Sequence, residues 1–170
     1  WLCDSTGSVG TSSVCQYGRV AIESPPTVVH NEHGAPFSLG YHDQRFQSLY
    51  LASELQAAGL PDGYQIDTIS LRCSVPPPLD IKEFRVAYAK TKDTAMTEFK
   101  PTSVVFGPTD IAKDDLAAGA WFELNLTVPI GFNNATNLIL EFSTDGQVDT
   151  SSTSGIYLSG YSFGRSWSDE

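Results

Sequence analysis

The chain has 170 residues, with 20 acidic residues against 10 basic ones and a formal net charge of −10. This charge should repel nucleic acid and anionic lipid, so neither is an expected partner. No apolar run approaches the ~18 to 20 residues that a membrane-spanning helix requires. The 10 prolines and 14 glycines are spread along the chain. This distribution is typical of many short strands joined by turns, and it predicts an all-β protein.

Two parts of unequal size are predicted, an N-terminal arm (1–26) and one β-sandwich domain (27–170). Within the arm, Gln16–Glu23 alternates as a strand does, and Pro25-Pro26 then ends it. The candidate assembly residues of this strand are Tyr17, Val20 and Ile22. Because the domain looks complete without it, the strand is a candidate for exchange with a neighbouring copy.

The cysteines and the glycosylation sequons bear on the compartment. Cys3 and Cys15 lie in a segment rich in serine, threonine and glycine, where a disulfide between them would contribute about 3 kcal/mol on the chain-entropy model. Cys73 is predicted to be a small buried hydrophobic residue. The alternative is three free thiols in a reducing compartment. Asn125 and Asn134 each begin an Asn-x-Thr sequon, which suggests glycosylation of an exported protein.

The best-specified local structure is a strand, one helical turn and a second strand. The first strand is indicated by Phe46, Leu49 and Leu51. Ser53 is the predicted N-cap of the helical turn, and Gly59 its C′ residue. Pro61-Asp62-Gly63 predicts a turn before the strand Ile66–Val75. The predicted inward side chains of that strand are Ile69, Leu71, Cys73 and Val75.

Further strands are predicted along the rest of the chain, at Ile81–Lys90, Ser103–Phe106, Trp121–Val128, Asn137–Ser143, Gly155–Gly160 and Tyr161–Trp167. Their predicted inward residues include Phe84, Val86, Tyr88, Phe122, Leu124, Leu126, Val128, Leu138, Leu140 and Phe142. The predicted surface connections are Thr91–Thr97, Gly107–Ala118 and Thr144–Ser154, and Phe99 is expected to return to the core. About nine to eleven short strands with one helical turn predict a jelly roll of two packed antiparallel sheets.

Several groups of residues could carry chemistry. His30 and His33, with His42-Asp43 near them in sequence, could form a metal pair, although a polar turn is the commoner explanation. Oxygen ligands for Ca²⁺ could come from Asp110, Asp114 and Asp115, or from Asp145 and Asp149, although solvated acidic loops are the commoner explanation. No other cofactor is expected. Because no nucleophile and base are paired in the sequence, a non-enzymatic protein is predicted.

Aromatic residues offer another possible site. The side chains that could stack on sugar rings, if they are not used in the core, are Trp121, Tyr157, Tyr161 and Trp167.

Two blocks of sequence resemble a known family. They are Arg45-Phe-Gln-Ser-Leu-Tyr-Leu-Ala-Ser-Glu-Leu-Gln-Ala-Ala-Gly59 and, further on, Ala120-Trp-Phe-Glu-Leu-Asn-Leu-Thr-Val-Pro-Ile-Gly-Phe132 with Asn137-Leu-Ile-Leu-Glu141. Together they resemble the jelly-roll β-sandwich module of secreted bacterial surface and adhesin-like proteins, over about residues 27–165. The resemblance implies a jelly roll, export and a role at the cell surface or in the extracellular matrix. It implies no catalytic residue.

The favoured interpretation is a secreted structural subunit. It would form a head-to-tail homo-oligomeric filament by adding Gln16–Glu23 to the open sheet edge of a neighbour. The alternative is a carbohydrate-binding or adhesin module with glycans as partners. A hydrolase is the third hypothesis, and no residues offer themselves for it.

Overall fold

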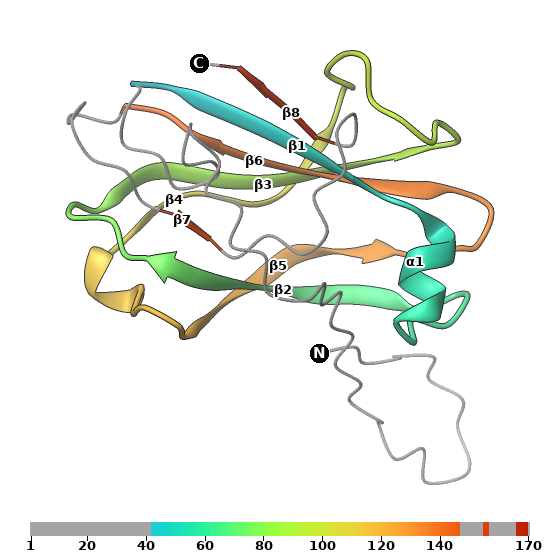
Figure 1. The fold of residues 1–170 in the computed structure, drawn as a ribbon, viewed down its shortest axis with the longest axis horizontal. Coiled ribbons are helices and arrows are strands. Elements are labelled where there is room, and N and C mark those ends of the chain that lie inside the picture. The colour runs from blue at the N-terminus through green and yellow to red at the C-terminus, as the bar shows by residue number, and fades with distance from the viewer. Residues whose placement is uncertain (1–41, 147–154, 157–165, 170) are drawn as a thin grey trace, which may run out of the picture.

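A computed structural model describes residues 42–146, 155–156 and 166–169 (Figure 1). Its elements are β1 (Gln44–Tyr50), α1 (Ala52–Ala57), β2 (Gln65–Val75), β3 (Ile81–Thr91), β4 (Ser103–Ile111), the 3₁₀ turn η1 (Lys113–Asp115), β5 (Trp121–Gly131), β6 (Asn137–Thr144), β7 (Gly155–Ile156) and β8 (Ser166–Asp169). The prediction of an all-β protein is therefore confirmed. The predicted arm, the disulfide between Cys3 and Cys15, and the assembly residues Tyr17, Val20 and Ile22 lie outside the described residues.

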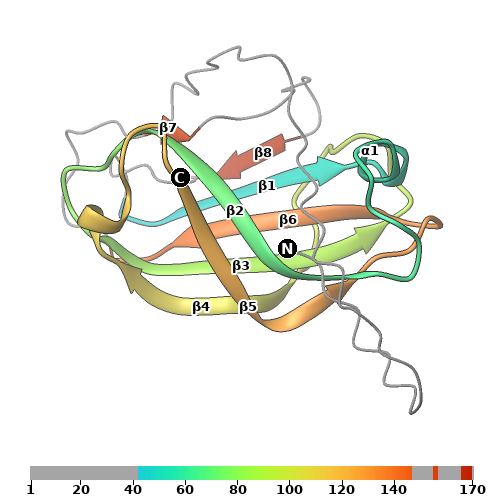
Figure 2. The same ribbon diagram turned by 90° about the horizontal axis from the view of Figure 1, so that it is seen from below.

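The strands form two antiparallel sheets. The larger sheet has the order β4-β3-β6-β1-β8, and the smaller one the order β5-β2-β7. Figure 2 shows β2 and β5 crossing one face of the larger sheet. The pairing is nested, because β3 pairs with β4, β2 with β5 and β1 with β6. Along the described part of the chain, each of these pairs encloses the pair before it.

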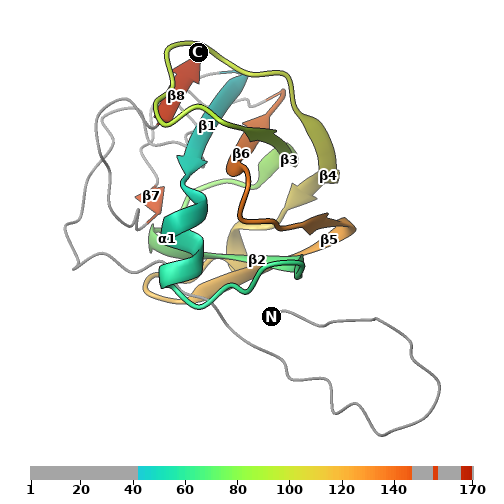
Figure 3. The same ribbon diagram turned by 90° about the vertical axis from the view of Figure 1, so that its right-hand side faces the viewer.

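The two sides of the molecule differ (Figure 3). On one side β4 and β5 approach each other, and Thr127 of β5 donates a hydrogen bond to the carbonyl oxygen of Val105 in β4 at 2.8 Å. On the other side the sheets end in the short strands β8 and β7. The sheet edges are therefore joined on one side, whereas short strands border the other.

The main core lies between the sheets and confirms most of the predicted inward faces. The larger sheet contributes Phe46, Phe84, Val86, Leu138, Leu140 and Phe142, and the smaller one contributes Ile69, Cys73, Leu124 and Ile130. The ring of Phe84 stacks on that of Phe142 with centroids 6.3 Å apart. Cys73 is 1% exposed, and burial raises the pKa of its thiol. Its predicted role as a buried hydrophobic residue is confirmed.

The start of α1 differs from the prediction. Leu51, not Ser53, is the N-cap residue, and Ser53 is the second residue of the helix. The first helical N–H, that of Ala52, donates to Oδ1 of Asn137 at 2.8 Å. The N–H of Leu51 donates to Oε2 of Glu54 at 3.0 Å. Ser53 was expected to supply the hydrogen-bond acceptor at the start of the helix, but Asn137 of β6 supplies it instead. The side chain of Ser53 is exposed.

The end of α1 agrees with the prediction. Gly59 has φ +101° at the C′ position. Its N–H donates to the carbonyl oxygen of Gln56, and the N–H of Leu60 donates to that of Leu55, both at 2.9 Å. This pair of bonds is the Schellman motif, and both Leu60 and Leu55 are buried in the main core.

Strand β4 is longer than predicted. The sequence indicated a surface connection from Gly107 onward, but β4 continues to Ile111, which pairs with Ile81 of β3. Proline is tolerated in an edge strand because its missing N–H is not needed there, so Pro108 does not end β4. Gly107 has φ +80°, and a Cβ at this position would lie 2.1 Å from the carbonyl oxygen of Phe84. Only glycine fits.

Strand β5 corrects the predicted position of Val128, which is 54% exposed. Ile66 pairs with Ile130, whereas Thr68 pairs with Asn125, so the register shifts between these pairs. Such an irregularity leaves extra residues of β5 unpaired and turns Val128 outward. Ile130 is fully buried in its place.

The outer face of the larger sheet is also partly buried. Ile139 of β6 packs there against Leu49 and against Met96 from the connection between β3 and β4, which was predicted to be a polar loop. Phe99 does not enter the main core as expected, because it is half-buried with the guanidinium of Arg45 4.5 Å from its ring centroid. Thr144, predicted to begin a solvated loop, is a buried residue at the end of β6.

Candidate functional site

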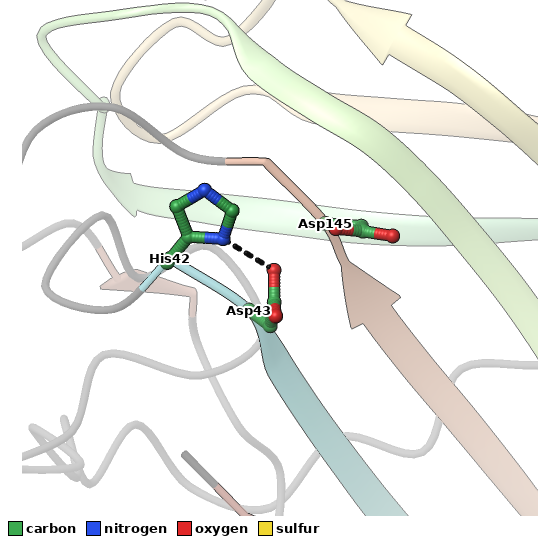
Figure 4. A group of neighbouring side chains, drawn as sticks. All are labelled: His42, Asp43 and Asp145. Carbon is green, nitrogen blue, oxygen red and sulfur yellow. Dashed lines mark hydrogen bonds and ion pairs between the residues drawn. The ribbon is translucent and has the colours of Figure 1, made fainter.

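Three polar side chains lie close together where β1 begins and β6 ends. Gln44 pairs with Thr144, so His42 and Asp43 just before β1 lie beside Asp145 just after β6. One possible ligand atom from each of these three residues lies within 4.8 Å of the others (Figure 4). The sequence had placed His42-Asp43 and Asp145 in two separate candidate groups, and the structure brings them together. His30, His33 and Asp149 lie outside the described residues.

Hydrogen bonding gives the two carboxyl groups of this cluster different pKa values. Nδ1 of His42 lies 2.7 Å from Oδ1 of Asp43, which also accepts the N–H of Gly146 at 3.2 Å. These contacts, the histidine first, lower the pKa of Asp43. The hydrogen bond to Asp43 and the negative charge of that group raise the pKa of Asp145. Asp43 therefore loses its proton at a lower pH than Asp145 does.

This cluster is a poor cation site as it stands. An imidazole nitrogen and two carboxylates are chemically suitable ligands, but all three side chains are exposed. Ca²⁺ takes about six to eight oxygen ligands, and the cluster supplies far fewer. Exposed acidic groups commonly gather in this way without an ion.

Of the other predicted Ca²⁺ ligands, Asp110, Asp114 and Asp115, Asp110 forms an ion pair. Oδ2 of Asp110 on β4 lies 2.7 Å from Nζ of Lys82, and its Oδ1 accepts the N–H of Glu83 at 3.0 Å. The hydrogen bond from Lys82 is the main reason why the pKa of Asp110 is lowered. Asp114 and Asp115 lie in the exposed turn η1. The carboxylate of Asp110 thus fastens β4 to β3.

Glu141 in β6 is a buried carboxylate that no sequence pattern indicated. Its Oε2 accepts hydrogen bonds from Nε and Nη2 of Arg45 at 2.9 and 2.7 Å, from Thr102 at 3.0 Å, and from the side-chain amide of Gln47. Gln47 also binds both backbone polar groups of Lys100, donating at 2.7 Å and accepting at 2.9 Å. These contacts tie the connection between β3 and β4 onto the sheet. The four hydrogen bonds that Oε2 of Glu141 accepts indicate a structural role for this carboxylate.

The outward side of the smaller sheet carries a mixed polar and aromatic surface. Inward residues of β2 and β5 alternate with outward ones, and the register sets the outward residues opposite one another in pairs. We call these residues the β2–β5 outer face: Thr68, Ser70 and Arg72 on β2, and Trp121, Glu123 and Asn125 on β5. Trp121, one of the predicted sugar-stacking residues, is 43% exposed. The side chains of Tyr157, Tyr161 and Trp167 lie outside the described residues.

Both sequon asparagines are exposed. Asn125 lies within β5, and its Oδ1 accepts a hydrogen bond from Thr68 at 3.2 Å. Asn134 lies in the turn between β5 and β6, where its backbone N–H donates to Oδ1 of Asp62 at 2.9 Å. Glycosylation of either residue stays a prediction.

The strand pairing and buried core define an all-β protein of two facing antiparallel sheets. No protein-family model, curated protein or solved structure matches the chain. Among the described residues, no helix is long and apolar enough to cross a membrane.

Proposed function

We propose that this chain is a non-enzymatic subunit of an extracellular filament, assembled by strand donation between neighbouring jelly-roll domains. The observation that carries the proposal is the nested strand order. In a jelly roll, the first strand pairs with the last, the second with the last but one, and so on inward to a central hairpin. Three pairs of this series are present here. The pair β1 and β6 corresponds to the second pair, β2 and β5 to the third, and β3 and β4 to the central hairpin.

The same strand order indicates a position in the smaller sheet at which a further strand would pair. If β7 is taken as the last strand of such a jelly roll, with the short strand β8 added beside β1, then β7 should lie beside β2, and it does. The remaining position, the partner of β7, belongs to a strand that precedes β1 in the chain. Among the described residues no strand occupies that position, and β7 ends the smaller sheet. Unpaired backbone groups at a sheet edge are a template for an added strand.

The predicted strand Gln16–Glu23 is the proposed occupant. It precedes β1, and Pro25-Pro26 separates it from the rest of the chain by a stiff, extended spacer. Val20 and Ile22 would face the core, and backbone hydrogen bonds would supply most of the affinity. When the strand is given to a neighbour, the contact is head to tail and does not close, so it propagates into a fibre. Such a filament requires export of the chain.

Full-length protein carrying Val20→Asp or Ile22→Asp tests the proposal, with Arg19→Ala on the opposite face of the strand as the control. Light scattering and negative-stain microscopy should show filaments of the unmodified chain and of the control, and short or monomeric species of the two aspartate variants. A synthetic peptide of residues 14–26, added in excess, should shorten the filaments by occupying the acceptor edge.

Monomers of the unmodified chain at all concentrations would overturn the proposal. If the two aspartate variants then also unfold more readily than that monomer, the strand completes its own domain.

A further inference from the structure

We infer that Asp145 and Gly146 form a self-modifying site, at which the chain isomerises its own backbone to isoaspartate without an enzyme. Asp-Gly is the dipeptide at which this chemistry is easiest, because glycine has no side chain to hinder attack by its amide nitrogen. The sequence contains two such dipeptides, Asp62-Gly63 and Asp145-Gly146. Their surroundings differ, and only the second has a carboxylate beside the attacking amide. This inference does not rest on the proposed filament.

The amide of Gly146 lies beside a base. Its N–H donates to Oδ1 of Asp43 at 3.2 Å, so a carboxylate is already in place to take the proton during attack. Nδ1 of His42 lies 2.7 Å from the same oxygen and helps to hold Asp43 in its ionised form. A Cβ built on Gly146 would meet nothing within 4 Å, so the residue is not crowded by the rest of the chain.

Charged groups from β1 and β3 surround the carboxyl group of Asp145. Asp43 lies beside it at the start of β1 (Figure 4). On β3, Nη1 of Arg85 lies 3.9 Å from Oδ2 of Asp145, while Nη2 of Arg85 is bound to Glu83 at 2.6 Å. Lys82 directs its ammonium group to a carboxylate of β4 instead. The surroundings of Asp145 are therefore more acidic than basic.

These surroundings favour the reactive form of Asp145. The hydrogen bond to Asp43, and then the negative charges of Asp43 and Glu83, raise the pKa of Asp145, against the smaller effect of Arg85. Its carboxyl group therefore keeps its proton to a higher pH than usual. The protonated acid is the form that can lose water when an amide nitrogen attacks it. Asp43, whose pKa is lowered, stays ionised under the same conditions.

The reaction balances within this group of residues. The amide nitrogen of Gly146 forms a bond to Cγ of Asp145, and its proton passes to Asp43. Asp43 returns a proton to the hydroxyl group on Cγ, which leaves as water, and a succinimide ring remains. A second water then opens the ring. Opening at Cγ restores aspartate, whereas opening at the main-chain carbonyl carbon gives isoaspartate and lengthens the main chain by one carbon between β6 and β7.

The other Asp-Gly dipeptide lacks these features. The N–H of Gly63 donates to the carbonyl oxygen of Phe132 at 3.2 Å, and Oδ1 of Asp62 accepts the N–H of Asn134 at 2.9 Å. Cyclisation there has to break both hydrogen bonds, and a peptide carbonyl is a far weaker base than a carboxylate. Asp62-Gly63 is therefore an internal reference for the same chemistry in the same molecule.

Incubation of the full-length chain in H₂¹⁸O tests this inference, because each ring opening places one ¹⁸O atom in the aspartyl residue. Peptide mapping by mass spectrometry, with fragmentation that distinguishes isoaspartate, measures Asp145 and Asp62 in the same sample. In mildly acidic buffer, Asp145 should take up ¹⁸O at least fivefold faster than Asp62 does. Uptake at Asp145 should slow as the pH rises, because its carboxyl group then loses the proton that the reaction needs.

Two variants identify the cause of the difference. Asp43→Asn removes the base and should slow uptake at Asp145 at least threefold, with no change at Asp62. Asp114→Asn makes the same change of charge at an exposed position in η1, so it should alter neither rate. Thermal unfolding checks that each variant is folded.

Uptake at Asp62 that equals or exceeds uptake at Asp145 would overturn the inference. It is also wrong if Asp43→Asn leaves the rate at Asp145 unchanged, or if that rate rises with pH. The rates are measured on peptides after digestion, so they can be obtained whether or not filaments form. Failure of this inference and failure of strand donation are therefore distinguishable.

Discussion

Arg45 of β1 directs both Nε and Nη2 to a single carboxylate oxygen of Glu141 in β6, at 2.9 and 2.7 Å. The two side chains come from neighbouring strands and face away from the main core. Glu141 is the buried partner, with its side chain 10% exposed, whereas that of Arg45 is 39% exposed. The carboxylate also holds Gln47, which is fully buried and binds Lys100 in the connection between β3 and β4. One buried charge thus joins two strands and a loop.

Glu141→Ala is expected to lower the free energy of unfolding by about 2 to 4 kcal/mol. The substitution removes the acceptor shared by Arg45, Gln47 and Thr102 and leaves polar groups buried without it. Urea denaturation followed by circular dichroism measures the change. The control is Glu98→Ala, which removes an exposed carboxylate paired with Lys100 and should cost less than about 1 kcal/mol. Equal effects of the two substitutions would contradict the structural role of Glu141.

Gly107→Ala should destabilise the protein far more than Gly119→Ala. Both glycines have a positive φ, +80° and +76°, so both substitutions carry a backbone cost of about 1 to 2 kcal/mol. A Cβ at Gly107 also meets the carbonyl oxygen of Phe84 at 2.1 Å, whereas a Cβ at Gly119 meets nothing within 4 Å. The midpoints of thermal unfolding report the difference. Similar midpoints would mean that β3 and β4 can separate locally at no great cost.

The carboxyl groups of Asp43 and Asp145 should titrate in separate pH ranges. The pKa of Asp43 is lowered, so its contacts contribute stability that is present above its unfolded pKa and is lost as the pH falls through the folded value. The pKa of Asp145 is raised, so its contribution is present below its unfolded pKa and is lost as the pH rises through the folded value. Carboxyl ¹³C shifts measured against pH should show Asp43 titrating below Asp145.

A His42→Ala variant separates the causes of these shifts. His42 is the largest cause of the lowered pKa of Asp43, so its removal should bring that pKa back toward the ordinary value. Asp62→Asn, at an exposed carboxylate that binds Asn134 far along the chain, serves as the control and should leave both titrations unchanged. If Asp43 titrates identically without the histidine, the hydrogen bond between them is not maintained in solution.

Much of the fold followed from the alternation of apolar residues, since a period of two requires only local sequence. The inward residues Ile69, Phe84 and Leu124 were identified in this way. The end of α1 was also local, because a glycine at C′ satisfies carbonyl groups of its own helix. The start of α1 could not be predicted from the neighbouring residues. Its acceptor is Asn137, far along the chain, which no pattern around Ser53 could indicate.

The remaining errors depended on how strands pair. Val128 lies on the apolar side of a regular alternation, and only the register shift against β2 turns it outward. Glu141 looked like an ordinary outward residue until a loop from elsewhere in the chain covered it. Asp43 and Asp145 became neighbours only through the pairing of β1 with β6. The chemistry at each of these positions is set by long-range contacts.

The nested pairing also implies an order of folding. The hairpin of β3 and β4 closes the shortest loop, and the pairs β2–β5 and β1–β6 each enclose the pair before them. Closing a loop costs more entropy as it lengthens, so the inner pairs should form first and bring the ends of the outer pairs together. The strand that we propose as the partner of β7 would then be the last to join. A domain whose strands pair from the central hairpin outward can complete its other pairs before a strand is added beside β7. That added strand can come from the same chain or from a neighbouring one.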